Sequence, residues 1–216
     1  LEQHEYEGDL ENIADGWAER WKTLYDRMSR TQKAKWDAYY ADANQEYQLV
    51  KHDPKQLLQW KYRRYMHDYL GSVLSMDRNI GRVLDYLDKE GLAKNTIVVY
   101  TSDQGFYLGE HGWFDKRFMY EESMRTPLAI RYPAEIEPDQ VITEMVQNID
   151  YAPTLLDLAG VSVAPGMQGL SLRGLVTGEA DTLDRDGLYY HYYQGIETEH
   201  HVAKQYGVRT KNHKLI

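Results

Sequence analysis

The sequence predicts an α/β fold in which helices flank a sheet, followed by the start of a small antiparallel subdomain. A long helical stripe of apolar residues ends at a glycine and leads through a short turn into a β-branched run at residues 96–101. That order of helix, turn and buried strand is half of an α/β unit. Two short runs near the end, 187–193 and 206–209, predict the antiparallel strands, and residues 214–216 begin a third.

The first 52 residues are polar with scattered aromatic side chains, and they predict a helical surface segment. The aromatic residues recur at three- or four-residue spacing, as on one face of a helix: Trp17, Trp21 and Tyr25, then Trp36, Tyr39 and Tyr40. We interpret them as two short helices that pack against a core. A lectin-like aromatic platform is the alternative.

The strongest element is a helix from Asp53 to Gly91. Asp53 is an N-cap residue, Pro54 suits the first helical position, and Gly91 suits the C-terminal end. Between them the apolar residues alternate at intervals of four and three: Tyr62, Met66, Tyr69, Val73, Met76, Ile80, Val83 and Leu87. A helix with one such face requires a sheet or another helix to cover it.

The remaining elements are shorter. Residues 96–101 are apolar on both faces, which is typical of a parallel strand buried from both sides. Residues 126–133 predict a second strand, and Asp150 is expected to cap a helix that Gly160 ends. Residues 161–187 are glycine-rich and predict a loop. We therefore divide the chain at residues 1–52, 53–186 and 187–216.

Composition excludes several classes of function. Lys and Arg number 25 against 34 Asp and Glu, and no basic run occurs, so nucleic-acid binding is disfavoured. No apolar run approaches the roughly 18 residues that span a bilayer. The absence of Cys rules out disulfides, thiolate metal sites and a cysteine nucleophile within this chain. The chain begins with Leu1 and stops at Ile216 within an expected strand, so we expect it to be a segment of a longer protein.

Chemistry is concentrated after the strand at 96–101, because ligands bind beyond the carboxyl ends of strands in α/β sheets. Asp103 and Gln104 offer carboxylate and amide oxygens, which suit a hard cation such as calcium or magnesium. A turn or helix cap is the plainer explanation for such an Asp. The glycine-rich loop that follows carries His111, Lys116 and Arg117, an inventory that suits an anion beside a cation site. Taken singly, His111 and Lys116 are most simply ordinary loop residues.

Several motifs in order resemble the type I, formylglycine-dependent sulfatases over roughly residues 60–216. They are Asn95–Arg117, Tyr120–Pro127, Ile149–Val161, Tyr206–Thr210 and Lys214–Ile216. The bacterial glycosaminoglycan sulfatases, especially the N-acetylglucosamine-6-O-sulfatase branch, are the most similar. The resemblance implies an alkaline-phosphatase-like mixed sheet flanked by helices, a sulfated saccharide substrate and an extracytoplasmic, periplasmic location.

The resemblance also implies roles for individual residues. Asp103 and Gln104 match two calcium ligands, and Lys116 matches the lysine that contacts the sulfate and its bridging oxygen. His111 and Arg117 are expected to contact substrate, with bracing of the loop an equal alternative for Arg117. His200 is expected to reach the sugar, against the plainer expectation that it is solvated or structural.

The family nucleophile is missing from this chain. It is a Cys or Ser in the pattern Cys/Ser-x-Pro/Ala-x-Arg, oxidised to formylglycine, and Ser162–Gly166 fails that pattern at its last position. We expect the nucleophile and further metal ligands in a missing N-terminal half of the same fold, without which this segment is inactive. In the family, the formylglycine hydrate attacks sulfur, the alcohol leaves, and the hemiacetal expels sulfate.

Two other functions remain open at this point. A phosphodiesterase or phosphonate hydrolase of the alkaline phosphatase superfamily would share the sheet and the strand-end Asp, although Gln104 argues against zinc. A non-catalytic binding module derived from a sulfatase is the second alternative.

Overall fold

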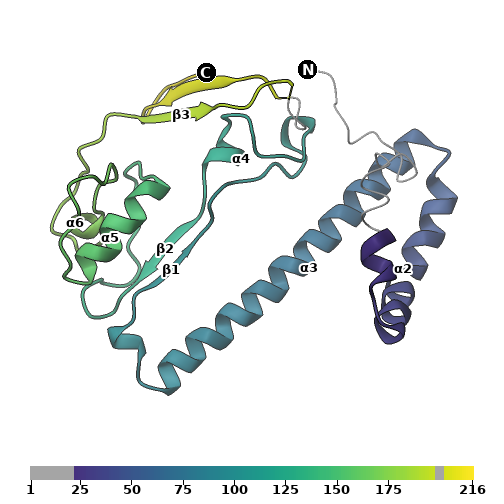
Figure 1. Ribbon diagram of the computed structural model, residues 1–216, viewed down its shortest axis with the longest axis horizontal. Helices are drawn as coiled ribbons and strands as arrows, with labels where there is room; N and C mark the ends of the chain where they lie inside the picture. Colours follow the sequence, from purple (N-terminus) through teal and green to yellow (C-terminus); the bar gives the residue numbers. More distant parts are fainter. Residues whose placement is uncertain (1–21, 198–201) are drawn as a thin grey trace. The chain divides into compact units, whose positions relative to one another are not determined.

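The computed structural model describes residues 22–197 and 202–216 (Figure 1). The chain divides into two compact units. The first contains the described residues up to Gly81 together with Leu108–Phe114, and the second contains Arg82–Tyr107 and Asp115–Ile216. The division expected from the sequence, at residues 1–52, 53–186 and 187–216, describes continuous segments of the chain. The two units of the structure are spatial groups of residues, so the two divisions cannot be compared directly.

The first unit is built on two helices, α2 (Arg30–Val50) and α3 (Pro54–Lys89). The residues of α3 from Arg82 onward belong to the second unit. The expected helix start is confirmed, because Asp53 Oδ1 accepts hydrogen bonds from the amides of Lys55 and Gln56 at 3.0 and 3.1 Å. The second of the two expected helices, which carries Trp36, Tyr39 and Tyr40, is present as α2, but with 21 residues it is not short. No Gly or Pro interrupts that stretch, so nothing in it stops the helix. Trp17 and Trp21 lie outside the described residues.

The two helices meet at a small core formed by Ala43, Tyr47 and Trp60. The Trp60 indole also donates to Glu46 Oε2 at 3.2 Å. Of the aromatic residues expected to pack against a core, Trp36 is 36% exposed and Tyr39 is 54% exposed, so the expectation fails for these two. The apolar stripe of α3 is also largely uncovered, with exposed large side chains at Tyr62, Val73, Met76 and Val83.

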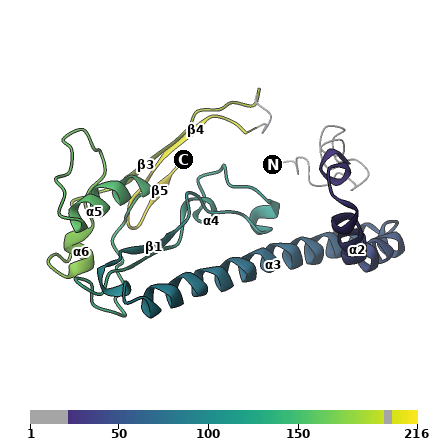
Figure 2. The same cartoon turned by 60° about the horizontal axis from the view of Figure 1, so that its bottom comes forward.

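The second unit begins with a two-stranded sheet, β1 (Val98–Thr101) and β2 (Leu128–Arg131) (Figure 1). The strands run antiparallel, with Thr101 opposite Leu128. Figure 2 shows β1 from a second direction. This corrects the expectation of a parallel strand buried on both faces, since Tyr100 is 41% exposed. The β-branched run identified a strand, but the direction of its partner depends on the connection after it, which here is a long loop without a crossover helix.

A hydrophobic core covers one side of this sheet. Leu158, Leu172, Leu175 and Val176 are buried and pack against Ile97, Leu128 and Ile130, among others. They come from α5 (Tyr151–Leu158) and from the approach to α6 (Arg173–Thr177) and α6 itself. The helix α6 lies within the stretch expected to be a loop, because burial of its apolar residues stabilises a five-residue helix that local sequence does not favour. Gly160, at φ 70°, ends α5 as expected.

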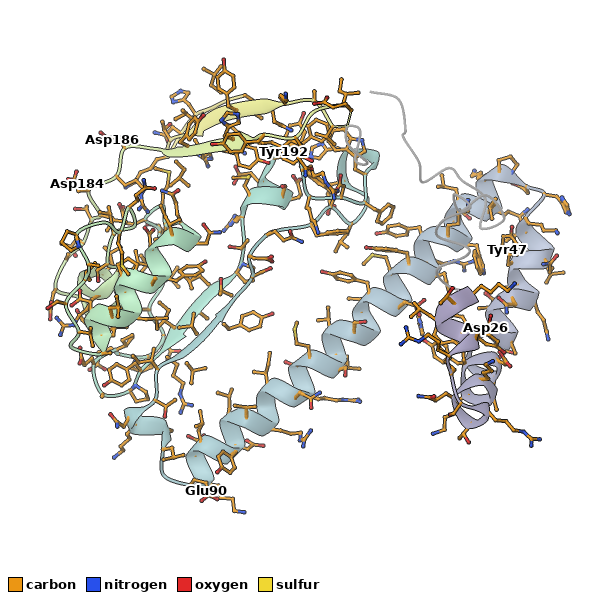
Figure 3. All side chains as sticks on the ribbon, viewed as in Figure 1. Asp26, Tyr47, Glu90, Asp184, Asp186 and Tyr192 are labelled. Atoms are coloured by element: carbon orange, nitrogen blue, oxygen red, sulfur yellow. The ribbon has the colours of Figure 1, made fainter. Side chains whose placement is uncertain are left out.

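The end of the chain forms a three-stranded antiparallel sheet in the order β3 (Leu188–Tyr192), β4 (Gln205–Arg209) and β5 (Lys214–Leu215). All three strands predicted from the sequence are present. Tyr192 lies on β3, and Asp184 and Asp186 mark the connection that enters it (Figure 3). In the part of the chain that the structure describes, no helix has the length and apolar character needed to cross a membrane.

Candidate active site

The turn after β1 places Asp103 and Gln104. The Ser102 hydroxyl donates to the Gln104 carbonyl at 2.7 Å, and the amide of Gly105 donates to the Ser123 carbonyl at 2.8 Å. A Cβ at Gly105 would lie 2.0 Å from the Glu122 carbonyl oxygen, so only glycine allows this approach. The turn is therefore held by its backbone, which leaves the side chains of Asp103 and Gln104 available for other contacts.

Asp103 and Gln104 suit a metal ion only as part of a larger ligand set. Asp103 is exposed and Gln104 is half-buried. Within residues 22–197 and 202–216, no cluster of three or more His, Asp or Glu side chains forms a metal site. Two oxygen donors fit a calcium site in kind, but calcium takes six to eight ligands, so the others must come from elsewhere.

Lys116 lies in the second unit, just before α4 (Glu121–Met124). Its side chain is half-buried, and no carboxylate of the described residues forms an ion pair with it. Its backbone carbonyl accepts a hydrogen bond from the Ser123 hydroxyl. Arg117, by contrast, forms an ion pair with Asp115 of the same loop, and its expected contact with substrate stays a prediction.

Ser123 joins the two candidate segments. Its carbonyl accepts from the Gly105 amide in the turn of Asp103 and Gln104, and its hydroxyl donates to the carbonyl of Lys116. The residue is 4% exposed, so both bonds are shielded from water. One buried serine thus connects the turn of the expected cation site to the segment of the expected sulfate-binding lysine. Both of its hydrogen bonds are to backbone groups, not to the side chains of Asp103 or Lys116.

His111 belongs to the first unit, whereas Asp103 and Lys116 belong to the second. It lies in the turn η2 (Glu110–Gly112) at a φ of 58°, is exposed, and has its ring 5.9 Å from that of Trp113. Phe114 anchors this turn on α3, with its ring 4.5 Å from the ring of Tyr65. His200 lies outside the described residues, so its expected contact with sugar stays a prediction.

Asp150 has a different role from the helix cap that the sequence predicts. It precedes α5 as expected, but its side chain does not cap that helix. Its carboxylate is fully buried and accepts hydrogen bonds from the amides of Gln147 and Leu170 and from the guanidinium of Arg185. No local pattern signals this pairing, because Arg185 is 35 residues away in the sequence.

Tyr107 and Glu121 are two further residues near Lys116 that no motif of the sequence indicates. Tyr107 is fully buried, and burial raises the pKa of its hydroxyl to about 12. Hydrogen bonding to Lys214 is the main cause that lowers the pKa of Glu121, with Arg209 adding to it. Both residues flank the segment that carries Lys116.

Comparison with known proteins connects these segments to one family. The Sulfatase family model matches residues 19–161, and the model described as N-sulphoglucosamine sulphohydrolase, C-terminal, matches residues 109–216. An N-acetylglucosamine-6-O-sulfatase of Bacteroides thetaiotaomicron is 50% identical over 196 residues, which cover 90% of this chain and 35% of the relative. The chain therefore spans about a third of that relative's length.

Two solved structures extend the comparison. One, a complex with its substrate D-glucosamine-2-N,6-O-disulfate, aligns with a TM-score of 0.81 at 50% identity and covers 88% of this chain and 38% of that chain. A phosphonate monoester hydrolase of Silicibacter pomeroyi aligns with a TM-score of 0.54 at 34% identity, over 63% of this chain and 25% of that one. The resemblance seen in the motifs is thus confirmed: the chain belongs to the sulfatase family, with the α/β fold of that family.

Proposed function

We propose that the full-length protein hydrolyses sulfate monoesters on glucosamine units of sulfated glycosaminoglycans. The main support is the 50% identity, over 90% of this chain, to a bacterial N-acetylglucosamine-6-O-sulfatase. A similar solved structure contains a disulfated glucosamine as its substrate, which supports the same class of saccharide. The nucleophile, a formylglycine, is supplied by a part of the protein outside this chain.

Asp103 and Gln104 are proposed to contribute oxygen ligands to a calcium ion. The donor types fit, and Asp103 has an exposed carboxylate at the end of β1. A bound calcium ion supplies positive charge next to the sulfate oxygens. The contribution of this chain is to hold the turn in place through Gly105 and Ser123, so that both ligands are presented without rearrangement.

Lys116 is proposed to neutralise the charge that develops on the leaving alcohol oxygen. Its ammonium group has no carboxylate partner among the described residues, so it is available to an anionic substrate. Its backbone is fixed by neighbouring segments, which matters because a preorganised cation stabilises the transition state without further reorganisation.

Phosphonate ester hydrolysis is the second candidate, since a phosphonate monoester hydrolase shares the fold at a TM-score of 0.54. Sulfate release from N-acetylglucosamine 6-sulfate by the purified full-length protein, measured by ion chromatography, tests the proposal. We expect turnover at least 100-fold faster than that of an aryl phosphonate monoester. A preference for the phosphonate would support the second candidate, and binding of the saccharide without turnover of either ester would identify a non-catalytic module.

A further inference from the structure

The segment that carries Lys116 is fixed by hydrogen bonds to its backbone carbonyls. Every carbonyl from Asp115 to Met119 accepts a hydrogen bond from outside that stretch. The donors are the Tyr107 amide to Asp115 at 2.7 Å, the Ser123 hydroxyl to Lys116, the Tyr190 hydroxyl and Gln205 Nε2 to Arg117 at 3.0 and 3.1 Å, the Tyr107 hydroxyl to Phe118 at 2.7 Å and Lys214 Nζ to Met119 at 2.9 Å. Five neighbouring peptide groups are thereby fixed in a segment without regular secondary structure.

Three of these donors come from the sheet β3–β4–β5, with one on each strand. Tyr190 lies on β3, Gln205 on β4 and Lys214 on β5. The sheet also approaches closely, since a Cβ at Gly207 on β4 would lie 2.5 Å from the sulfur of Met119. The C-terminal sheet is therefore part of the support of the Lys116 segment.

Gln205 is the most specific of these contacts, because both ends of its amide are used. Its Nε2 donates to the Arg117 carbonyl, and its Oε1 accepts from the Met119 amide at 3.4 Å. The side chain thus donates to one peptide group and accepts from another, as a neighbouring strand would. The first of these groups, the Arg117 carbonyl, is one residue after Lys116. A side chain that must donate at one end and accept at the other fixes the orientation of the peptide groups that it contacts.

We propose that Gln205 is a positioning residue for Lys116, through which the C-terminal sheet sets where the ammonium group lies relative to the sulfate ester. The inference rests on the proposed function, because it gives a role to the lysine that the function requires. Gln205 does not contact the substrate in this proposal. It acts only through the backbone at Arg117 and Met119.

The test replaces Gln205 by Glu in the full-length enzyme. Gln205→Glu keeps the size of the side chain but replaces the donor to Arg117 by a carboxylate oxygen, which repels that carbonyl. We expect kcat for N-acetylglucosamine 6-sulfate to fall about 10-fold or more, because small displacements of a charge-stabilising group are costly in rate. Gln140→Glu is the matched control, since the Gln140 amide also donates to two backbone carbonyls, of Glu137 and Val176, away from this segment. It should retain the wild-type rate.

A series of aryl sulfates separates positioning from general structural damage. If Lys116 is displaced, the loss in rate grows as the leaving alcohol becomes a poorer leaving group, because such alcohols depend most on charge neutralisation. Structural damage lowers the rate equally for all leaving groups. In a Lys116→Ala background, Gln205→Glu should cause less than a twofold further loss, since the residue it positions is gone.

Three outcomes overturn the inference. They are a wild-type rate for Gln205→Glu, an equal loss for every leaving group, and additive losses with Lys116→Ala. If the wild-type protein releases no sulfate, the proposed function itself fails, whereas an active enzyme that needs Lys116 but not Gln205 refutes this inference alone. Should Gln205→Glu not fold, Tyr190→Phe removes a donor to the same carbonyl, with Tyr192→Phe on the same strand as its control because the Tyr192 hydroxyl donates to Gln194.

Discussion

Asp150 and Arg185 form a bidentate ion pair, with Oδ2 of Asp150 2.6 Å from Nη1 of Arg185 and Oδ1 2.7 Å from Nη2. The Asp150 side chain is 0% exposed and that of Arg185 only 7%. Through the Leu170 amide, at 2.9 Å, the same carboxylate also holds the approach to α6. One buried pair thus joins the start of α5, the segment before α6 and the connection into β3.

Arg185→Ala should therefore destabilise the full-length protein by about 3–5 kcal/mol, because it leaves a buried carboxylate without its counterion. Urea unfolding measures this change. Arg173→Ala is the matched control, since Arg173 pairs with Glu135 at 2.9 Å but on the surface, where such pairs contribute about 0–1 kcal/mol. Equal losses for the two variants would show that the buried pair has no special role.

The stability that Asp150 contributes should depend on pH. Burial alone would raise the pKa of Asp150, but the hydrogen bonds from Arg185, Gln147 and Leu170 outweigh it and lower the pKa below its usual value. A carboxyl with a lowered pKa in the folded state contributes stability above its unfolded pKa, about 3.9, and loses it as the pH falls through the folded pKa. Asp150→Asn should thus be less stable than wild type at pH 7, with a difference that shrinks below about pH 4. A difference that does not change with pH would contradict this assignment.

Turnover is expected to depend on calcium, with Asp103 as one of the ligands of the ion. Dialysis against a chelator should lower turnover, and added calcium should restore it. For Asp103→Ala, we expect half-restoration to require at least 10-fold more calcium than for wild type. Asp181→Ala removes another exposed carboxylate and should behave as wild type. An Asp103 variant with wild-type calcium dependence would remove this residue from the ligand set.

His200 is expected to recognise the sugar rather than the sulfate. His200→Ala should reduce kcat/KM for the natural saccharide by roughly 10-fold, about the 1.4 kcal/mol of one lost hydrogen bond. Turnover of a small aryl sulfate, which lacks the sugar, should be nearly unchanged. His213→Ala, on an exposed residue next to β5, is the control. Equal losses on both substrates would assign His200 to structure or chemistry instead.

Local signals predicted the parts of this fold that depend on neighbouring residues. The helix α3 follows from its apolar period and from the cap at Asp53, both of which lie within a few residues of the structure they specify. The antiparallel pairing of β1 with β2 and the bond between Asp150 and Arg185 involve residues that are far apart in the sequence. No spacing pattern encodes such partners.

In the candidate site, too, the sequence predicts some features and only the structure shows others. Asp103 and Lys116 are candidate site residues because their residue types occur within a recognisable motif. The contacts that hold their segments are made to backbone carbonyls, by Ser123 and Gln205 among others. Since every residue has a carbonyl, its use as an acceptor leaves no mark in the sequence, and only the structure reveals these supports.

The most direct test of the account is the rate at which Lys116→Ala releases sulfate from N-acetylglucosamine 6-sulfate in the full-length enzyme. Removal of one preorganised charge-stabilising group should lower turnover at least 100-fold, with an unchanged melting temperature. Lys94→Ala, which removes an exposed lysine from the turn before β1, should retain the wild-type rate. A wild-type rate for Lys116→Ala would contradict the account.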